Sequence, residues 1–243
     1  MSPTFLQSRW RPSPNHGPRA AGFRPNLLIL HYTGMADAHS AIERLCDPHS
    51  EVSAHYVIEE DGMVWQLVDE RRRAWHAGES YWRGARDINS SSIGIELVNP
   101  GAELGHRPFP VAQMRSLTTL AAQIMARHNI RPEDVLGHSD IAPQRKRDPG
   151  ELFDWPALAL QDMGLWPQIT AQDIADPPQD MALWQQALQQ YGYECPSSGQ
   201  DDPRTCAVIA AFQRHYRPES ITGLGDADTW ARLRALLRQT QRG

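Results

Sequence analysis

The segment NLLILHYTG (residues 26–34) constrains the fold most, because four consecutive apolar residues run directly into His31. A short apolar run without polar alternation is typical of a strand that is covered on both faces. Gly34 and the polar residues before it end the run. The segment therefore predicts a buried strand that stops at His31, inside a sheet with helices on both sides.

Alternating patterns continue through residue 166. Apolar residues recur at helical spacing in 38–45 and again in 111–128, whereas 92–99 is rich in β-branched residues. Residues 53–68 predict a hairpin that turns at Asp61-Gly62, and DVLGHSD (134–140) predicts a short strand. Together these elements predict an α/β fold, a mixed β-sheet flanked by helices. Residues 1–25, which are rich in Pro, Arg, Asn and Gly, predict an extended arm on the surface.

The composition changes after residue 166. The segment PQITAQDIADPPQD (167–180) contains three prolines and few bulky apolar residues, which is typical of a linker. Three stretches with apolar residues at helical spacing follow it. We therefore expect a first domain at 1–167, a linker at 168–178 and a small all-α domain at 179–243. A chain of 243 residues is long enough for two such units.

The overall charge limits the classes of partner. The net charge of −5 argues against nucleic acid or an anionic membrane as the main partner. No apolar run reaches the roughly 18 residues that span a bilayer, and the N-terminus lacks the apolar core of a signal peptide. We expect a cytoplasmic protein, or a periplasmic one if an export signal was removed, and a monomer is the favoured oligomeric state. Three isolated cysteines predict neither a zinc ribbon nor a redox motif.

Three polar residues stand where strands or their following loops should end, namely His31, His138 and Asp148. Two imidazoles and one carboxylate suit Zn²⁺ and leave a fourth tetrahedral position open. The chain contains ten histidines, so an alternative is that both are ordinary residues at strand ends.

Glu96 interrupts the otherwise apolar strand SIGIELVN. A buried carboxylate needs a partner, a ligand or a function, and a glutamate beside such a metal would be a general base. The alternative is an outward-facing glutamate on an edge strand. Lys146, two residues before Asp148, would stabilise a developing oxyanion if Asp148 reaches the metal; otherwise it is a solvated lysine in a loop.

The segment LGHSDIAPQRKRDPG (136–150) would deliver two of the three metal ligands from one loop. Pro143 and Pro149 limit the freedom of that loop, and Ser139 and Asp140 are expected to support it by hydrogen bonds. A second segment, AWHAGESYWRGARDINSSSIG (74–94), mixes aromatic, donor and small residues and predicts the lining of a groove. We expect His55, inside a strand, to be a hydrogen-bonded core histidine.

Five motifs, LILHYTG, SAHYVIEEDG, AWHAGES, SIGIELVN and LGHSDIAPQRKRDPG with the following FDW, occur in one order. Together they resemble the zinc-dependent N-acetylmuramoyl-L-alanine amidases of the AmpD/AmiD type, which share a fold with peptidoglycan recognition proteins and phage lysozyme-amidases. The resemblance covers about residues 10–167. It implies hydrolysis of the amide between N-acetylmuramic acid, or its anhydro form, and L-alanine of the stem peptide. The alternative is a peptidoglycan-recognition module that only binds.

The resemblance also implies roles for individual residues. His31, His138 and Asp148 match the zinc ligands, Glu96 matches the acid/base, and Lys146 matches the lysine that assists the tetrahedral intermediate. The phage branch has a tyrosine where this chain has Ala54, which leaves Glu96 the larger share of proton transfer. The residues expected to bind the peptidoglycan or muropeptide substrate are Tyr32, Trp75, His76, Arg86 and Asn89.

The segment from LQQYGYE to DADTWARLRALL resembles the small helical peptidoglycan-binding domain of many wall hydrolases. The alternative is a helical domain that only packs on the first one. Such a domain favours polymeric wall as the substrate, whereas the missing signal peptide favours recycled fragments, so the sequence leaves the two open. Because every proposed catalytic residue precedes residue 168, we expect residues 1–170 to fold alone.

Overall fold

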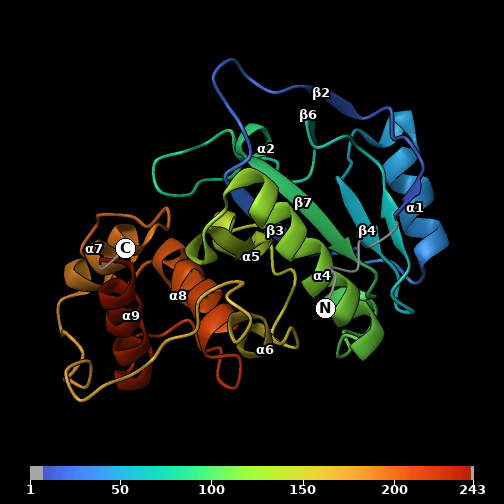
Figure 1. Ribbon diagram of the computed structural model, residues 1–243. Helices are drawn as coiled ribbons and strands as arrows, with labels where there is room; N and C mark the ends of the chain where they lie inside the picture. The colour runs from blue at the N-terminus through green and yellow to red at the C-terminus, as the bar shows by residue number, and fades with distance from the viewer. Residues whose placement is uncertain (1–7, 242–243) are drawn as a thin grey trace.

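The computed structural model describes residues 8–241, and its centre is a mixed six-stranded sheet (Figure 1). The strand order is β1-β5-β4-β7-β3-β8, and β2 and β6 pair separately. The strands are β1 (Arg9–Trp10), β2 (His16–Pro18), β3 (Leu27–Tyr32), β4 (Tyr56–Ile58), β5 (Val64–Gln66), β6 (Arg72–Ala74), β7 (Ser92–Leu97) and β8 (Val135–Gly137). The mixed sheet flanked by helices is thus confirmed.

The helices account for most of the remaining chain. They are α1 (Ala38–Cys46), α2 (Ile88–Ser91), α3 (Gly101–Leu104), α4 (Val111–His128), α5 (His138–Ile141), α6 (Trp155–Ala159), α7 (Met181–Tyr191), α8 (Pro203–Tyr216) and α9 (Ala227–Thr240), with short 3-10 helices at Pro48–Ser50 and Pro132–Asp134. The predicted hairpin is confirmed: β4 and β5 are antiparallel, and Gly62 in the turn has φ +91°. Positive φ is readily adopted only by glycine, which explains the Asp-Gly pair.

One face of the sheet is covered by α4. Alternate residues of a strand point to opposite faces, so Leu28 and Leu30 of β3 share this face with Ile93 and Ile95 of β7. They pack against the buried residues of α4, which include Leu117, Leu120 and Ile124. This face is closed by α4 together with buried residues around α6, among them Phe153, Trp155 and Leu158.

The opposite face is closed by two separate groups of helices. Near β4, Val57 packs against Ile42 and Leu45 of α1. Near β3 and β8, Leu27 and Ile29 belong to a core cluster that also contains residues of the C-terminal helices (Trp184, Leu188, Tyr193, Phe212 and Leu236). The core cluster on this side therefore continues from the sheet into the C-terminal helices, and α8 lies beside α5, which contacts β3 (Figure 1).

The C-terminal helices confirm the predicted all-α part of the fold. Each begins with an aspartate whose carboxylate accepts a backbone N–H of the first turn: Asp180 for α7, Asp202 for α8 and Asp226 for α9. Such caps satisfy donors that a helix start leaves free. The boundaries at 1–167, 168–178 and 179–243 stay predictions.

The segment that the sequence predicted as a linker contacts α9 through an ion pair. Asp173 is buried, and Arg238 of α9 donates to its carboxylate at 2.8 and 3.1 Å. Leu27 and Ile29 share a core cluster with residues of α7–α9, and the expectation that residues 1–170 fold alone stays a prediction.

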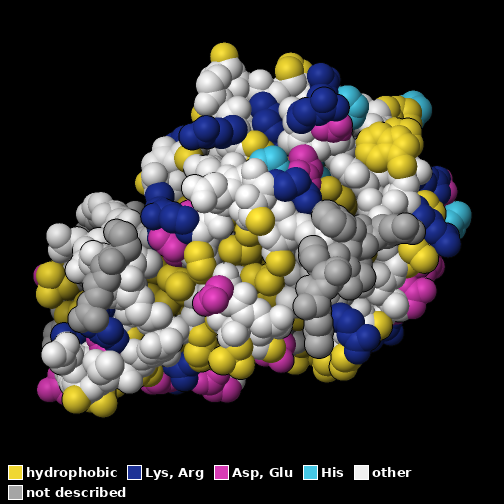
Figure 2. All heavy atoms as spheres, viewed as in Figure 1, with side chains coloured by type: hydrophobic (Ala, Val, Ile, Leu, Met, Phe, Trp, Pro, Cys, Tyr) yellow, Lys and Arg dark blue, Asp and Glu magenta, His cyan; other side chains and the backbone are white. Residues whose placement is uncertain are grey.

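The N-terminal arm is only partly a surface feature. Its described part adds β1 to the edge of the sheet, where β1 runs parallel to β5. Ser13 and Asn15 are buried, and their side chains donate hydrogen bonds to backbone carbonyls within residues 45–52. Residues 1–7 of the predicted arm lie outside the described residues. Across residues 8–241, no helix is long and apolar enough to cross a membrane. The three cysteines are free thiols, as predicted. Acidic and basic side chains are interspersed on the face shown in Figure 2.

Candidate active site

The sheet register brings the first histidine and the buried glutamate together. β3 and β7 are parallel, and His31 is the register partner of Glu96. Directly paired residues point to the same face, which is the face shared with Ile29 rather than the α4 face. The polar pair therefore lies between the part of the sheet that packs against α1 and the part whose core continues into the C-terminal helices.

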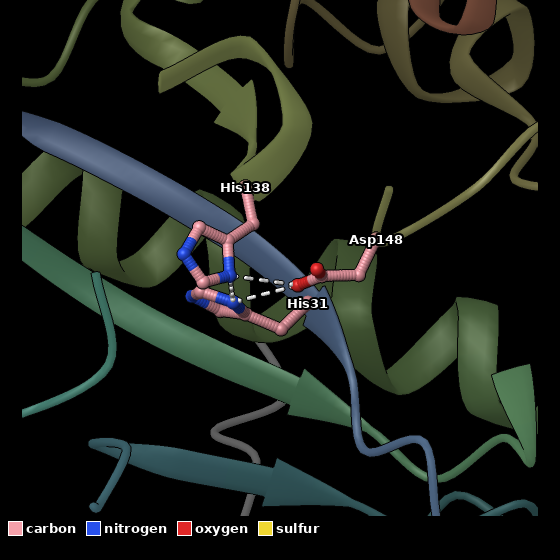
Figure 3. A group of neighbouring side chains, drawn as sticks. All are labelled: His31, His138 and Asp148. Atoms are coloured by element: carbon pink, nitrogen blue, oxygen red, sulfur yellow. Dashed lines mark hydrogen bonds and ion pairs between the residues drawn. The ribbon is translucent and has the colours of Figure 1, made fainter. Parts of the chain in front are cut away.

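His138 and Asp148 converge on His31 from the loop that follows β8 (Figure 3). His31 Nδ1 lies 2.9 Å from His138 Nδ1 and 2.9 Å from Asp148 Oδ2, and His138 Nδ1 lies 3.0 Å from the same carboxylate oxygen. All three side chains are buried. The structure thus brings together the three residues that the sequence proposed as metal ligands.

The hydrogen bonds of the Nε2 atoms, which point away from the triangle, define the tautomers of His31 and His138. His138 Nε2 donates to the carbonyl of Ala77 at 3.1 Å, which leaves Nδ1 as the unprotonated atom. Behind His31, the Ser92 hydroxyl donates to the Ile88 carbonyl, so it accepts from His76 Nε2. His76 Nδ1 is then an acceptor for His31 Nε2 at 3.0 Å. Both ligand histidines therefore direct a bare Nδ1 toward the same point.

The charges of the site match this assignment. Burial, together with the neighbouring His138, lowers the pKa of His31 to about 4, so His31 is neutral near pH 7. Two neutral nitrogens and one carboxylate oxygen, all facing one another, would be strongly repulsive without a cation between them. This donor set fits a divalent metal such as zinc.

Glu96 has the environment of a general base. Burial raises its pKa well above the usual range of a carboxyl group, and the negative charge of Asp148 adds to the effect. Its Oε2 is buried and has no hydrogen-bond partner among the described residues. A carboxylate with a raised pKa accepts a proton more readily near neutral pH.

A cavity of about 830 Å³ opens over these residues. Five of the expected residues line it together with the metal ligands, namely Tyr32, Trp75, His76, Glu96 and Lys146. The guanidinium of Arg145 donates to the carbonyls of Ala77 and Glu79, which joins the loop after β6 to the loop that carries Lys146.

Two residues expected to bind substrate lie elsewhere. Arg86 is exposed and forms an ion pair with Glu194 at 2.6 Å, and it does not line the cavity. Asn89 is buried, and its side-chain oxygen accepts the N–H groups of His76 and Ala77. Neither residue therefore lines the cavity: Asn89 shapes the loop, and Arg86 contacts the helical part.

His76 has a second contact that the sequence prediction missed. It lines the cavity, but its ring is buried and supports His31 from behind. Ser92, which completes this support, was also missed, and so were Tyr193 and His215, which contact Asp140 from the C-terminal helices. Serines and tyrosines in such positions have no spacing signal that separates them from other buried polar residues. His55 is a hydrogen-bonded core histidine, as expected.

Comparisons with known proteins agree with this geometry. The family described as N-acetylmuramoyl-L-alanine amidase matches residues 21–151, and the family described as putative peptidoglycan binding domain matches 178–233. The first match covers more than half of the chain. The chain belongs to the N-acetylmuramoyl-L-alanine amidase family.

Individual relatives extend the similarity to both parts of this amidase. It is 41% identical to the N-acetylmuramoyl-L-alanine amidase AmiD of Escherichia coli over 240 residues, which cover 91% of this chain and 85% of AmiD. It is 35% identical to the 1,6-anhydro-N-acetylmuramyl-L-alanine amidase AmpD of Enterobacter cloacae, over 62% of this chain and 88% of AmpD. The AmpD similarity thus covers much less of the chain.

Two solved structures are similar over nearly the whole amidase. E. coli AmiD, solved with anhydro-N-acetylmuramic acid-L-Ala-D-γ-Glu-L-Lys, has a TM-score of 0.79 at 40% identity and covers 92% of this chain and 93% of its own. AmpDh3 of Pseudomonas aeruginosa, solved with an anhydromuramic pentapeptide, has a TM-score of 0.81 at 31% identity over 98% of each chain. The resemblance found in the sequence is confirmed.

Proposed function

We propose that this amidase hydrolyses the amide bond between the lactyl group of N-acetylmuramic acid, or its anhydro form, and L-alanine of the stem peptide. The observation that carries the proposal is the buried triangle of His31, His138 and Asp148, with Glu96 on the adjacent strand. The substrate in the AmiD structure contains anhydro-N-acetylmuramic acid joined to L-Ala, and the AmpDh3 structure holds an anhydromuramic pentapeptide. A module that only binds would have no use for a buried, unpaired carboxylate beside the triangle.

His31, His138 and Asp148 would hold a zinc ion through Nδ1, Nδ1 and Oδ2. When bound, zinc would supply Lewis acidity, which lowers the pKa of water and polarises a carbonyl group. The hydrogen bonds behind the imidazoles, from His138 to Ala77 and from His31 to His76, orient both rings before any ligand arrives.

The chain's own residues would handle the proton and the developing charge. Glu96 would accept a proton from the attacking water and return it to the leaving amine of L-alanine. Lys146, which lines the cavity, would place its ammonium near the oxygen that becomes negative. Tyr32 and Trp75 line the same cavity and would contact the muramyl and peptide groups.

Mass spectrometry of the products tests this function. Incubation of the zinc-loaded enzyme with purified anhydro-muropeptide should release the free stem peptide, with L-alanine at its new amino terminus. A chelator should abolish the reaction and added zinc should restore it, and His31→Ala should lose both zinc and turnover. Cleavage within the peptide, or full turnover after chelation, would overturn the proposal. Intact sacculi run in parallel would separate fragments from polymeric wall as the preferred substrate.

A further inference from the structure

Asp140 is a buried carboxylate that joins the metal loop to the C-terminal helices. It lies two residues after His138 and has no exposed surface. Tyr193, which follows α7, donates its hydroxyl to Asp140 Oδ1 at 2.6 Å, and His215 of α8 donates from Nδ1 to Oδ2 at 2.7 Å. The sequence predicted a supporting role for Asp140, but these two donors come from 53 and 75 residues further along the chain.

The same carboxylate holds the backbone next to the ligands. The N–H of Gly137, directly before His138, donates to Asp140 Oδ2 at 2.7 Å. Gly137 in turn packs against Pro149, directly after Asp148, so closely that a Cβ would lie 2.8 Å from the proline ring. Ser139 N–H also donates to the Asp148 carbonyl at 2.9 Å. The positions of His138 and Asp148 therefore depend on the segment that Asp140 holds.

The two donors are themselves firmly placed. The ring of His215 stacks between Trp155, at 3.7 Å between ring centroids, and Tyr216, at 3.8 Å. Tyr193 lies fully buried against Trp82. A buried carboxylate is stable only when its oxygens are paired, and Tyr193 and His215 supply two of its three donors.

We propose that Tyr193 and His215 are positioning residues of the metal centre, which they orient through Asp140. This inference rests on the proposed function of His31, His138 and Asp148 as zinc ligands. The C-terminal helices then serve the hydrolytic site directly, in addition to any contact with the cell wall.

Tyr193→Phe tests the inference in the full chain. The variant keeps the ring and removes one donor to Asp140, and we expect zinc affinity, measured by competition with a chromophoric chelator, to fall about 10-fold. Tyr191→Phe is the matched control, because the Tyr191 hydroxyl is equally buried but bonds only Tyr216, at 2.6 Å. Both variants should lower the melting temperature by a similar amount, of about 2–4 °C, but only Tyr193→Phe should change zinc affinity. Equal zinc affinity in the two variants would overturn the proposal.

His215 offers a second comparison. His215→Asn keeps an N–H donor, whereas His215→Phe keeps the stacked ring without one. We expect zinc affinity to be higher in His215→Asn, and the reverse order would contradict the proposal.

Hydrogen exchange of the zinc-free protein separates this inference from the proposed function. In Tyr193→Phe, the Gly137 amide should exchange faster than in the wild type, while Tyr191→Phe should leave it unchanged. If the wild type bound no zinc, the proposed function would fail, and the exchange of Gly137 would still decide whether Tyr193 holds the loop.

Discussion

The two faces of the central sheet differ in how they are covered. On the α4 face, Leu28 and Leu30 of β3 and Ile93 and Ile95 of β7 pack against α4 and against buried residues around α6. On the other face, His31 and Glu96 are polar residues near the carboxyl ends of β3 and β7, two positions after Ile29 and Gly94. This face packs against α1 near β4, and its core cluster near β3 continues into helices more than 150 residues away in sequence. The polar residues lie between these two packed regions.

This difference assigns separate roles to the two faces. The α4 face contributes the free energy of burial, because every side chain on it loses contact with water. The opposite face leaves an interval in which polar side chains meet a cavity of about 830 Å³. Because alternate side chains of β3 and β7 point to opposite faces, their apolar residues stabilise the fold on the α4 face while His31 and Glu96 lie at the cavity on the other face.

The largest expected effect comes from the polar face. Glu96→Gln keeps the shape of the side chain but cannot accept a proton, so kcat should fall by about 10²–10⁴-fold. Zinc content, measured by atomic absorption, should not change. Glu103→Gln is the control, since Glu103 also lines the cavity but is exposed and lies outside the sheet. A near-normal kcat in Glu96→Gln would show that another residue is the base.

A change on the α4 face should act on stability alone. Leu117 has no exposed surface, and Leu117→Ala should reduce the free energy of unfolding by about 2–5 kcal/mol. The kcat of the folded fraction should equal that of the wild type. Leu160→Ala, at a position that is 87% exposed, should change the free energy of unfolding by less than about 0.5 kcal/mol. Denaturant unfolding measures both, and a lower kcat in folded Leu117→Ala would contradict the separation of the two faces.

The support behind His31 should give an intermediate effect. Ser92→Ala leaves the buried His76 Nε2 without its hydrogen-bond partner, which should cost about 1–3 kcal/mol of folding stability. Because His76 holds His31, zinc should also bind more weakly. Ser91→Ala is the matched control, since Ser91 is buried and bonds Asp87 and Ile88 but not His76. Identical zinc affinities in both serine variants would remove Ser92 from the support of the metal ligand.

The smallest effect is expected for Arg86, which lies outside both faces of the sheet. Arg86→Ala removes an exposed ion pair with Glu194, which should cost no more than about 1 kcal/mol. KM for anhydro-muropeptide should stay at the wild-type value, because Arg86 does not line the cavity. A several-fold rise in KM, measured from initial rates, would return Arg86 to the substrate site.

The sequence predicted the α4 face better than the opposite one. The period of apolar residues in 111–128 and the Asp61-Gly62 turn depend on local chemistry, and both elements appear where they were expected. His31 was recognised because it ends an apolar strand, and Glu96 because it interrupts one. Arg86 and Asn89 lie outside the cavity, because a mixture of aromatic and donor residues does not show which way each side chain points. The contacts of Tyr193 and His215 with Asp140 depend on tertiary packing, which no local pattern records.

The shared core of β3 and the C-terminal helices also affects how the chain is made. Leu27 and Ile29 leave the ribosome long before Trp184, Phe212 and Leu236, which belong to the same core cluster. At a synthesis rate of about 5–20 residues per second, this cluster stays incomplete for about 10–40 s. During that time its apolar strands are exposed to other nascent chains, so chaperones that hold such surfaces should increase the yield of folded enzyme.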